Sequence, residues 1–261
     1  MILVFDVGNT NITIGAFGGG VLAAKWRLNT DMRSTEDEYY IRLSALLKRA
    51  GINEREVEGA IIGSVVPAIT HTFAHLFRKY FRQEPVVINE KTKLGIKNLY
   101  KNKSEVGDDR IADAVAAKKM YPGADVIIID FGTAVSFEAL NKKGEYLGGA
   151  IMPGMNLSIK SLYSGTAKLP QISLKKPGKY IGDTTEKSVN SGIFHSMKAS
   201  VVAVTNGIKK EMKAKNALVL ITGGDASLEL TQGLGKKNVV IDKDLTLKGF
   251  YEIYSLNAKT K

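Results

Sequence analysis

Residues 2–10 read ILVFDVGNT, an apolar strand pattern that ends in a carboxylate, a glycine and two small hydrogen-bonding side chains. Two physical explanations fit this ending. Gly8-Asn9 is a favourable pair for a tight hairpin turn, and residues 11–17 alternate as a returning strand would. Alternatively, Gly8 lets the backbone approach a phosphate closely, and the polar residues after it supply hydrogen-bond donors. Asp6, at the strand end, would then hold Mg²⁺ through water, because Mg²⁺ prefers carboxylate and phosphate oxygens.

A second stretch repeats this arrangement. Residues 126–134 read VIIIDFGTA, and residues 135–140 alternate again. Both copies consist of an apolar strand, Asp-x-Gly, a short loop with a hydroxyl side chain, and another strand. Two such loops could clamp one polyphosphate from both sides, so the repeat favours phosphate binding over a simple turn. It also predicts a duplicated architecture with two related domains.

Strand and helix patterns alternate along the chain, which is typical of the α/β class. The clearest helix lies within residues 34–51, where Ser34 or Thr35 can cap the start and Gly51 can end the helix. Pro122-Gly123 breaks the chain, and we expect domains at residues 1–118 and 124–261. Further helices are expected at 68–81, 110–120, 156–163, 185–212 and 245–254, and strands at 61–62, 85–88, 146–151 and 218–221.

The composition of the chain excludes several kinds of site and of partner. The chain has 261 residues, a net charge of +11 and no cysteine, which excludes disulfides, thiolate zinc sites and cysteine nucleophiles. No apolar run reaches the roughly 18–20 residues that cross a bilayer, and no signal-peptide pattern is present. The lysines are dispersed, with no block of like charges and no base-stacking motif. We therefore expect a cytoplasmic protein with no membrane or nucleic-acid partner, whose charge suits small anions such as ATP.

Residues 105–113, EVGDDRIAD, form a second candidate cluster. Gly107 lies at an expected helix start, where an anion is favoured, and Arg110 offers a charged fork to a carboxylate. Asp109 could accept a hydrogen bond from a substrate hydroxyl and take its proton late in phosphoryl transfer, which depends mainly on positioning and charge. Asp113 shares its helix face. Ordinary acidic capping of a helix explains the same residues equally well.

Other motifs are weaker. Residues 222–225, TGGD, follow an apolar strand and could lie against adenine or ribose, or could simply form a turn capped by Asp225. His71 and His75 lack the glutamate and third ligand of a zinc hydrolase. Neither the Gly-x-x-x-x-Gly-Lys phosphate loop nor the Gly-x-Ser-x-Gly elbow occurs.

Taken together, five motifs resemble the type III pantothenate kinases, in the same order and over nearly the whole chain. The resemblance implies an α/β fold of two ribonuclease-H-like, actin-like ATPase domains with an active-site cleft between them. It also implies ATP-dependent phosphorylation of pantothenate to 4'-phosphopantothenate in coenzyme A synthesis, a homodimer, and dependence on Mg²⁺ and on K⁺ or NH₄⁺. The motifs are DVGNT at 6–10, GDDR at 107–110, DFGTA at 130–134, GGAIMPG at 148–154 and TGGDA at 222–226.

The resemblance also implies roles for single residues. Asp130 would ligate the monovalent cation, and Asp109 would accept the proton. ATP would be bound by Thr133 and by the first loop, which consists of Asp6, Val7, Gly8, Asn9, Thr10, Asn11, Ile12 and Thr13. Pantothenate would be bound by Tyr100, Gly107, Asp108, Asp109, Arg110 and Thr185, the last across the dimer interface, although Thr184 is adjacent and equally available.

Two departures blur the cation and ATP contacts. Val135, Ser136 and Glu138 stand where the family often has two threonines and an aspartate, and Lys103-Ser104 replaces a common proline. Three other functions also fit such a fold. They are another small-molecule kinase, a polyphosphate phosphatase, and a nucleotide-binding regulatory or scaffolding protein.

Overall fold

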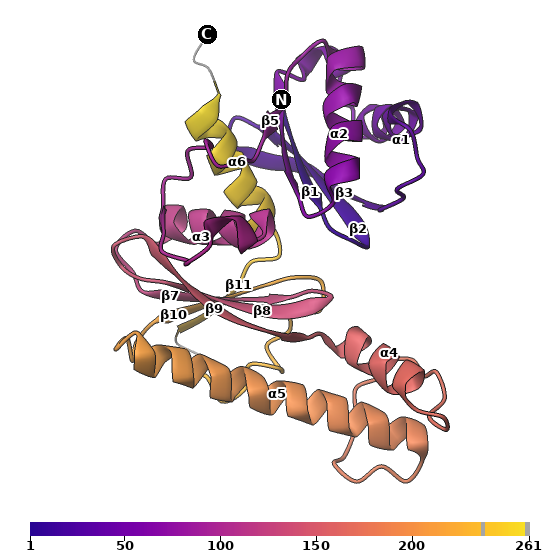
Figure 1. The fold of residues 1–261 in the computed structure, drawn as a ribbon, viewed down its shortest axis with the longest axis vertical. Helices are drawn as coiled ribbons and strands as arrows, with labels where there is room; N and C mark the ends of the chain where they lie inside the picture. The colour runs from indigo at the N-terminus through magenta and orange to yellow at the C-terminus, as the bar shows by residue number, and fades with distance from the viewer. Residues whose placement is uncertain (236–237, 259–261) are drawn as a thin grey trace. The chain divides into compact units, whose positions relative to one another are not determined.

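A computed structural model describes residues 1–235 and 238–258 of the chain (Figure 1). The chain forms two compact units. The first unit contains residues 1–120 and 244–261, and the second contains residues 121–243. The sequence predicted a break at nearly this place, but it assigned the C-terminal helix to the second domain, whereas this helix packs in the first unit.

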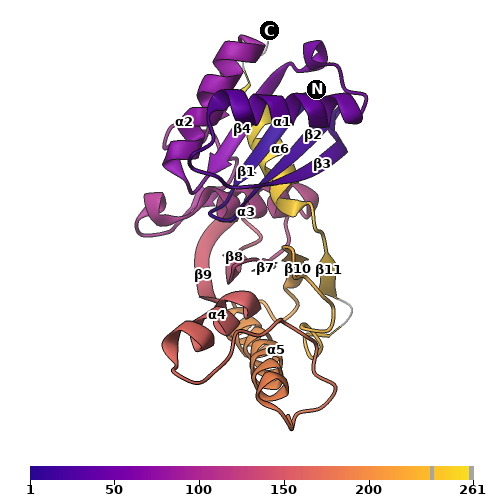
Figure 2. The ribbon, with the colours of Figure 1, turned by 90° about the vertical axis from the view of Figure 1, so that its right-hand side faces the viewer.

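The first unit is built on a mixed sheet with strand order β3-β2-β1-β4-β5. β1 pairs antiparallel with β2 and parallel with β4. Helices α1 and α2 lie on one side of this sheet and α6 on the other (Figures 1 and 2). The elements are β1 (Ile2–Val7), β2 (Asn11–Gly18), β3 (Val21–Asn29), α1 (Glu36–Arg49), β4 (Gly59–Ser64), α2 (Pro67–Leu76) with a π-helical continuation (Phe77–Phe81), β5 (Val86–Val87), β6 (Lys97–Asn98), α3 (Asp108–Met120) and α6 (Leu245–Asn257), with short 3₁₀ turns at Glu54–Glu56 and Lys103–Glu105.

The second unit repeats this topology. Its own five strands follow the order β9-β8-β7-β10-β11. Counted along the chain within each unit, the order is third, second, first, fourth and fifth in both. α5 runs along one face of the sheet (Figure 1), and the repeated topology confirms the duplication that the two loop motifs predicted. The elements are β7 (Val126–Phe131), β8 (Ala134–Leu140), β9 (Glu145–Pro153), α4 (Met155–Gly165), α5 (Thr185–Glu211), β10 (Leu218–Thr222) and β11 (Val239–Ile241).

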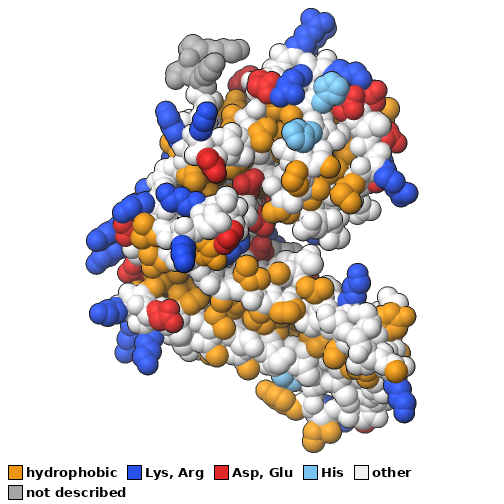
Figure 3. All heavy atoms as spheres, in the orientation of Figure 1, with side chains coloured by type: hydrophobic (Ala, Val, Ile, Leu, Met, Phe, Trp, Pro, Cys, Tyr) orange, Lys and Arg blue, Asp and Glu red, His pale blue; other side chains and the backbone are white. Residues whose placement is uncertain are grey.

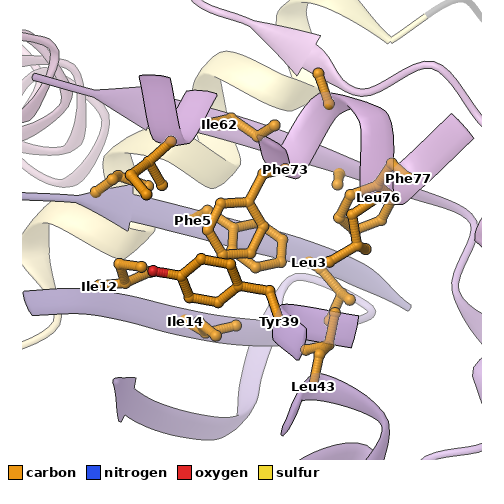
Figure 4. Packing of buried hydrophobic residues seen from close by; sticks show 14 of the residues in the cluster. Leu3, Phe5, Ile12, Ile14, Tyr39, Leu43, Ile62, Phe73, Leu76 and Phe77 are labelled. Carbon is orange, nitrogen blue, oxygen red and sulfur yellow. The ribbon is translucent and has the colours of Figure 1, made fainter. Parts of the chain in front are cut away.

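The side chains of β1 point alternately to the two faces of the sheet, and this determines which of them enter the core of the first unit. Leu3 and Phe5 point to the face that α1 and α2 cover, as expected for a strand with period two (Figure 4). There Phe5 contacts Phe73 of α2 with ring centroids 4.8 Å apart, and Tyr39 of α1 lies 4.9 Å from the same ring. These aromatic contacts join both helices to the first strand, which carries the Asp6 motif.

Local sequence signals set the helix ends. Thr35, not Ser34, caps α1: its hydroxyl accepts the N–H of Glu38, whose carboxylate accepts the N–H of Thr35 in return. Gly51 follows the helix with a φ of 71°. The other expected helices are present as well. β3, β6 and β11 were missed, although β3 alternates Lys25, Trp26, Arg27 and Leu28 in the pattern of a half-exposed strand. No helix within the described ranges is long and apolar enough to cross a membrane.

α6 packs closely against β4 and α3 because a glycine lies at each contact. A β-carbon on Gly63 of β4 would overlap the ring of Phe250, and one on Gly249 would overlap the backbone oxygen of Ala112 in α3. Phe250 is fully buried. The last helix of the chain therefore belongs to the first unit for steric reasons that its own sequence pattern does not reveal.

Gly249→Ala should lower the free energy of unfolding by about 2–4 kcal/mol, because the new methyl group meets backbone that cannot move aside easily. Gly207→Ala in α5 is the matched control, since no atom lies within 4 Å of a β-carbon there. It should be neutral or stabilise by roughly 0.5–1 kcal/mol. Urea unfolding followed by circular dichroism measures both changes, and equal effects of the two substitutions would contradict the packing argument.

Candidate functional site

The first set of candidate residues surrounds the end of β1. Asp6 pairs with Thr13 of β2 and lies beside Gly63 of β4. The N–H of Gly8 donates to the backbone oxygen of Asn11 at 3.0 Å, which closes a hairpin. The hairpin and the polar loop are thus the same feature: the turn orders the backbone and leaves the side chains of Asn9 and Thr10 exposed.

Thr30 braces this loop from the end of β3. Its hydroxyl donates to the backbone oxygen of Gly8 at 2.7 Å, and its N–H donates to the backbone oxygen of Thr10 at 3.0 Å. Two hydrogen bonds from one residue hold the loop at both ends, which preorganises its exposed groups. Thr30 belongs to no sequence motif and becomes a neighbour of the loop only through strand pairing, so it was not predicted as a site residue.

The helix that carries the second cluster starts at the same edge of the sheet. The N–H of Ser64, at the end of β4, donates to Oδ2 of Asp108 at 2.9 Å. Ser64 pairs with Val7, the last residue of β1. The loop after Asp6 and the start of α3, which are about 100 residues apart in sequence, therefore meet at one edge of the first sheet.

Asp109 lies in the first turn of α3 with a defined carboxylate position. Its Oδ1 accepts the N–H of Arg110 at 2.8 Å. A β-carbon at Gly107 would come within 2.6 Å of this oxygen, so glycine is the residue that leaves the carboxylate in place. Both Asp109 and Arg110 are half-buried. A helix start with a fixed carboxylate and an adjacent guanidinium can bind a substrate that carries a hydroxyl and a negative charge.

The carboxyl group of Asp108 is partly buried. The pKa of its carboxyl group is raised to about 6, mainly by burial and also by the charge of Asp109, while the hydrogen bond from Ser64 opposes the rise. One of its oxygens is already engaged by β4, so Asp108 anchors α3 to the sheet. Its expected contact with substrate stays a prediction.

Tyr100 precedes this helix in an extended segment. Its N–H donates to Oδ1 of Asn98 at 2.9 Å, and the residue is half-buried. The role that the resemblance implies for Tyr100 as a substrate contact is compatible with this position and stays a prediction.

The second set of residues surrounds the end of β7 in the other unit. Asp130 pairs with Ser136 of β8 and lies beside Thr222 of β10. The N–H of Gly132 donates to the backbone oxygen of Ala134 at 3.1 Å, and Thr133 is exposed at the tip of this turn. Asp130 thus has the same place in its sheet as Asp6 has in the first, with a turn one residue shorter after it.

Two further motifs close around this turn. Gly223 has a φ of 94°, and a β-carbon there would overlap Oδ1 of Asp130. The N–H of Gly154, between β9 and α4, donates to the backbone oxygen of Thr133 at 3.0 Å, and a β-carbon there would lie 2.5 Å from that oxygen. These motifs are far apart in the sequence, and their meeting was not predicted. Glycine at both positions lets three backbone segments meet at one edge of the second sheet.

Thr184 and Thr185 have different surroundings at the start of α5. Thr184 is the N-cap, and its hydroxyl accepts the N–H of Lys187 at 3.2 Å. Thr185 is the first helical residue and is exposed. Because the hydroxyl of Thr184 already caps the helix, Thr185 is the better candidate for a ligand contact.

The residues present fit hard cations with few protein ligands. Within the described ranges, no three His, Cys, Asp or Glu side chains gather around a possible metal position. Mg²⁺ commonly binds through one or two carboxylates plus water and phosphate oxygens. Asp6 and Asp130, each a single carboxylate at a strand end beside a phosphate-type loop, suit such sites better than a closed protein cage.

Comparisons with known proteins agree with this arrangement. Residues 2–207 match the sequence profile of the type III pantothenate kinases. A conserved Campylobacter jejuni protein assigned to the Baf family of transcriptional activators is 20% identical, with a TM-score of 0.58 and 98% of both chains covered. Lmo2764 from Listeria monocytogenes, assigned as an N-acetylmannosamine kinase, is 13% identical, with a TM-score of 0.55 and 99% of both chains covered.

MreB5 of Spiroplasma citri, bound to ADP, is 10% identical with a TM-score of 0.52, and the match covers 97% of this chain and 95% of that one. At such identities a structural match establishes the fold alone. The chain therefore has the mixed α/β, two-sheet fold of the actin-like ATPases and sugar kinases, which confirms the fold class expected from the sequence.

Asp108→Asn should change how stability depends on pH. Because the pKa of Asp108 is raised from 3.8 to about 6, its stabilising contribution is complete below about pH 4 and is lost as the pH rises through about 6. Asparagine keeps an oxygen for the N–H of Ser64 and carries no charge. We expect the variant to be more stable than the wild type by about 1–3 kcal/mol above pH 6, and this advantage to disappear near pH 4.

Urea unfolding between pH 4 and pH 8 measures this difference. Asp183→Asn serves as a control of opposite sign, because the hydrogen bond from Lys187 lowers the pKa of the exposed Asp183. Parallel pH profiles of the wild type and Asp108→Asn would show that the carboxyl group is not buried as described.

Proposed function

We propose that this chain, which belongs to the type III pantothenate kinase family, transfers the γ-phosphoryl group of ATP to the primary hydroxyl of pantothenate, the first step of coenzyme A synthesis. The family is one of ATP-dependent kinases, and its sequence profile covers residues 2–207. The observation that carries the proposal is the start of α3, where Gly107 leaves the carboxylate of Asp109 in place beside Arg110.

ATP would be bound by the two turns that end the first strand of each sheet. Asp6 to Thr13 would supply backbone and side-chain donors to the phosphate oxygens, with the backbone held by Thr30. Thr133 would donate its hydroxyl to a phosphate oxygen from the equivalent turn of the second unit. Residues 222–225, beside that turn, would lie against the adenosine. Preorganised donors of this kind stabilise charge that develops during phosphoryl transfer.

Pantothenate would be held at the start of α3. The Arg110 guanidinium and the positive end of the helix dipole suit its carboxylate, and Tyr100 would contact the same molecule. Asp109 would accept a hydrogen bond from the primary hydroxyl. As the bond from the hydroxyl oxygen to the γ-phosphorus forms and the bond to the bridging oxygen of ADP breaks, the hydroxyl proton would pass to the carboxylate of Asp109, and ADP would leave with the bonding electrons.

Cations would assist at the two strand ends. Asp6 would hold Mg²⁺ through water, and Asp130 would ligate K⁺ or NH₄⁺. The close backbone at Gly223 shapes the surroundings of the Asp130 carboxylate. When bound, these cations would neutralise charge on the phosphate oxygens.

A homodimer is part of the proposal, with Thr185 of one subunit contacting pantothenate in the other. Support comes from large apolar side chains that the second unit exposes near the start of α5. Tyr180 and Ile181 are 74% and 80% exposed, and Tyr163 of α4 is 47% exposed. Exposed apolar residues in one region mark surfaces that another protein covers.

The proposal is tested by incubating the purified protein with ATP, Mg²⁺ and pantothenate, with and without K⁺. ADP is measured by chromatography and phosphopantothenate by mass spectrometry. We expect ADP release that requires pantothenate and rises with K⁺. Asp109→Asn should lower kcat by about 10²–10⁴-fold, the usual contribution of a positioned general base, while its circular dichroism and thermal midpoint stay unchanged.

Other results would point elsewhere. A folded protein that releases no ADP with pantothenate, but turns over N-acetylmannosamine or polyphosphate, would replace the substrate. ATP binding without turnover, together with salt-dependent DNA binding, would indicate a regulatory protein instead. A full rate in Asp109→Asn would remove this residue as the proton acceptor.

Gly107→Ala should lower kcat without unfolding the protein. The added methyl group would lie 2.6 Å from Oδ1 of Asp109 and push the carboxylate away, and misplacement by about 1 Å can cost roughly 10²-fold in rate. Gly165→Ala, where no atom lies within 4 Å of the new β-carbon, is the matched control. Steady-state kinetics with varied pantothenate measures both variants, and an unchanged kcat in Gly107→Ala would contradict the positioning argument.

A further inference from the structure

A lysine-lined hollow lies where α5 ends in the second unit. Its volume is about 530 Å³, and it is lined by Asn206, Lys209, Lys210, Lys213, Lys215 and Leu234. On the face shown in Figure 3, Lys and Arg side chains gather over this end of α5. None of these residues takes part in the proposed kinase reaction.

Within the described residues, the lysines of the hollow have no ion-pair partner, in contrast to several other lysines of this unit. Lys175 pairs with Glu186 at 2.9 Å, and Lys176 pairs with Glu229 at 2.9 Å. No carboxylate of the described chain forms an ion pair with the four lysines that line the hollow. An anion in the hollow would therefore be attracted to several ammonium groups at once.

The backbone conformation of Lys213 distinguishes this cluster from an ordinary helix end. Basic residues in the last helical turn, such as Lys209 and Lys210, complement the helix dipole. Lys213 lies beyond the helix with a φ of 53°. It is part of a Schellman motif: its N–H donates to the backbone oxygen of Lys210, and the N–H of Ala214 donates to the backbone oxygen of Lys209. Glycine is the usual residue there. A lysine at this position strains the backbone while it adds a charge to the hollow.

One lysine of the hollow, Lys209, is partly removed from water. Burial lowers the pKa of Lys209, which means that its charged form lacks full hydration. Leu234, which is buried, forms an apolar part of the wall. Charges in such surroundings bind anions more tightly than fully hydrated lysines do.

The lining also defines the kind of anion. The hollow offers ammonium groups and one amide, but no aromatic ring on which a base could stack. Residues 121–243 contain no arginine, so planar bidentate recognition is absent as well. Its volume is in the range of small-molecule sites, about 300–1,000 Å³. These features suit a compact anion of several phosphate groups rather than a base or a carboxylic acid.

The hollow is separate from the ATP-binding turn of the same unit. The lysines precede β10, whereas Thr222 ends it beside Asp130. β10 has five residues, and at about 3.3 Å per residue its ends are roughly 13 Å apart. The two sites therefore lie at opposite edges of the second sheet.

We propose that this hollow binds a compact polyphosphate anion, such as a tripolyphosphate group, at a second site outside the kinase residues. The proposal does not depend on kinase activity, because binding is measured without ATP or pantothenate. The probe is inorganic tripolyphosphate, titrated by calorimetry at 0.1 M NaCl into the full chain.

The test variant is Lys209→Gln with Lys213→Gly, which removes two charges and places the preferred glycine in the strained turn, so that folding is preserved. Lys175→Gln with Lys176→Gln is the matched control, with the same loss of charge in the same unit. We expect the test variant to bind at least about tenfold more weakly, because two charge-assisted contacts are lost. The control should stay within about twofold of the wild type.

Three outcomes would overturn the proposal. Equal weakening in both variants would reduce the effect to net charge. Unchanged binding in the test variant would place tripolyphosphate elsewhere. Binding of a 20-bp DNA duplex that depends on Lys209 and Lys213, without tripolyphosphate binding, would make this end of α5 a nucleic-acid surface instead.

Discussion

Parallel pairing of the first and fourth strands of each sheet is the constraint on which the candidate site depends. β1 lies beside β4, and β7 lies beside β10, so the ends of these strands meet at one edge of each sheet. Ligands of open α/β sheets bind at such carboxyl ends. Because the pairing is direct, Asp6 has Gly63 as its neighbour and Asp130 has Thr222. Polar loops that are distant in sequence thereby become one surface within each unit.

Close backbone approach is the second requirement, and glycine provides it. Gly154 and Gly223 let backbone segments meet around the turn after β7, and Gly249 lets α6 lie directly on α3. At each of these positions a methyl group would meet backbone or the Asp130 carboxylate. Steric contact therefore explains these three glycines, and of the three only Gly223 also has a positive φ.

Charge is distributed differently between the two kinds of candidate site. At the start of α3, two carboxylates lie close together, and burial together with the neighbouring charge raises the pKa of Asp108. At the end of α5, lysines lie together without carboxylate partners in the described chain. Clusters of like charge are costly to maintain and are typical of functional sites. The same reasoning therefore applies to the residues proposed for the kinase reaction and to the lysine-lined hollow.

The sequence by itself determined the class of fold, the duplication and most helices, because these follow from local periodicity, capping and repeated motifs. The capping box of α1 and the repeated Asp-x-Gly turns are examples. Tertiary structure alone decided which motifs meet: the link from Ser64 to Asp108, the brace from Thr30 and the approach of Gly223 to Asp130 join residues far apart in the chain. It also decided that α6 belongs to the first unit. Such contacts depend on strand order and packing, which no local pattern encodes.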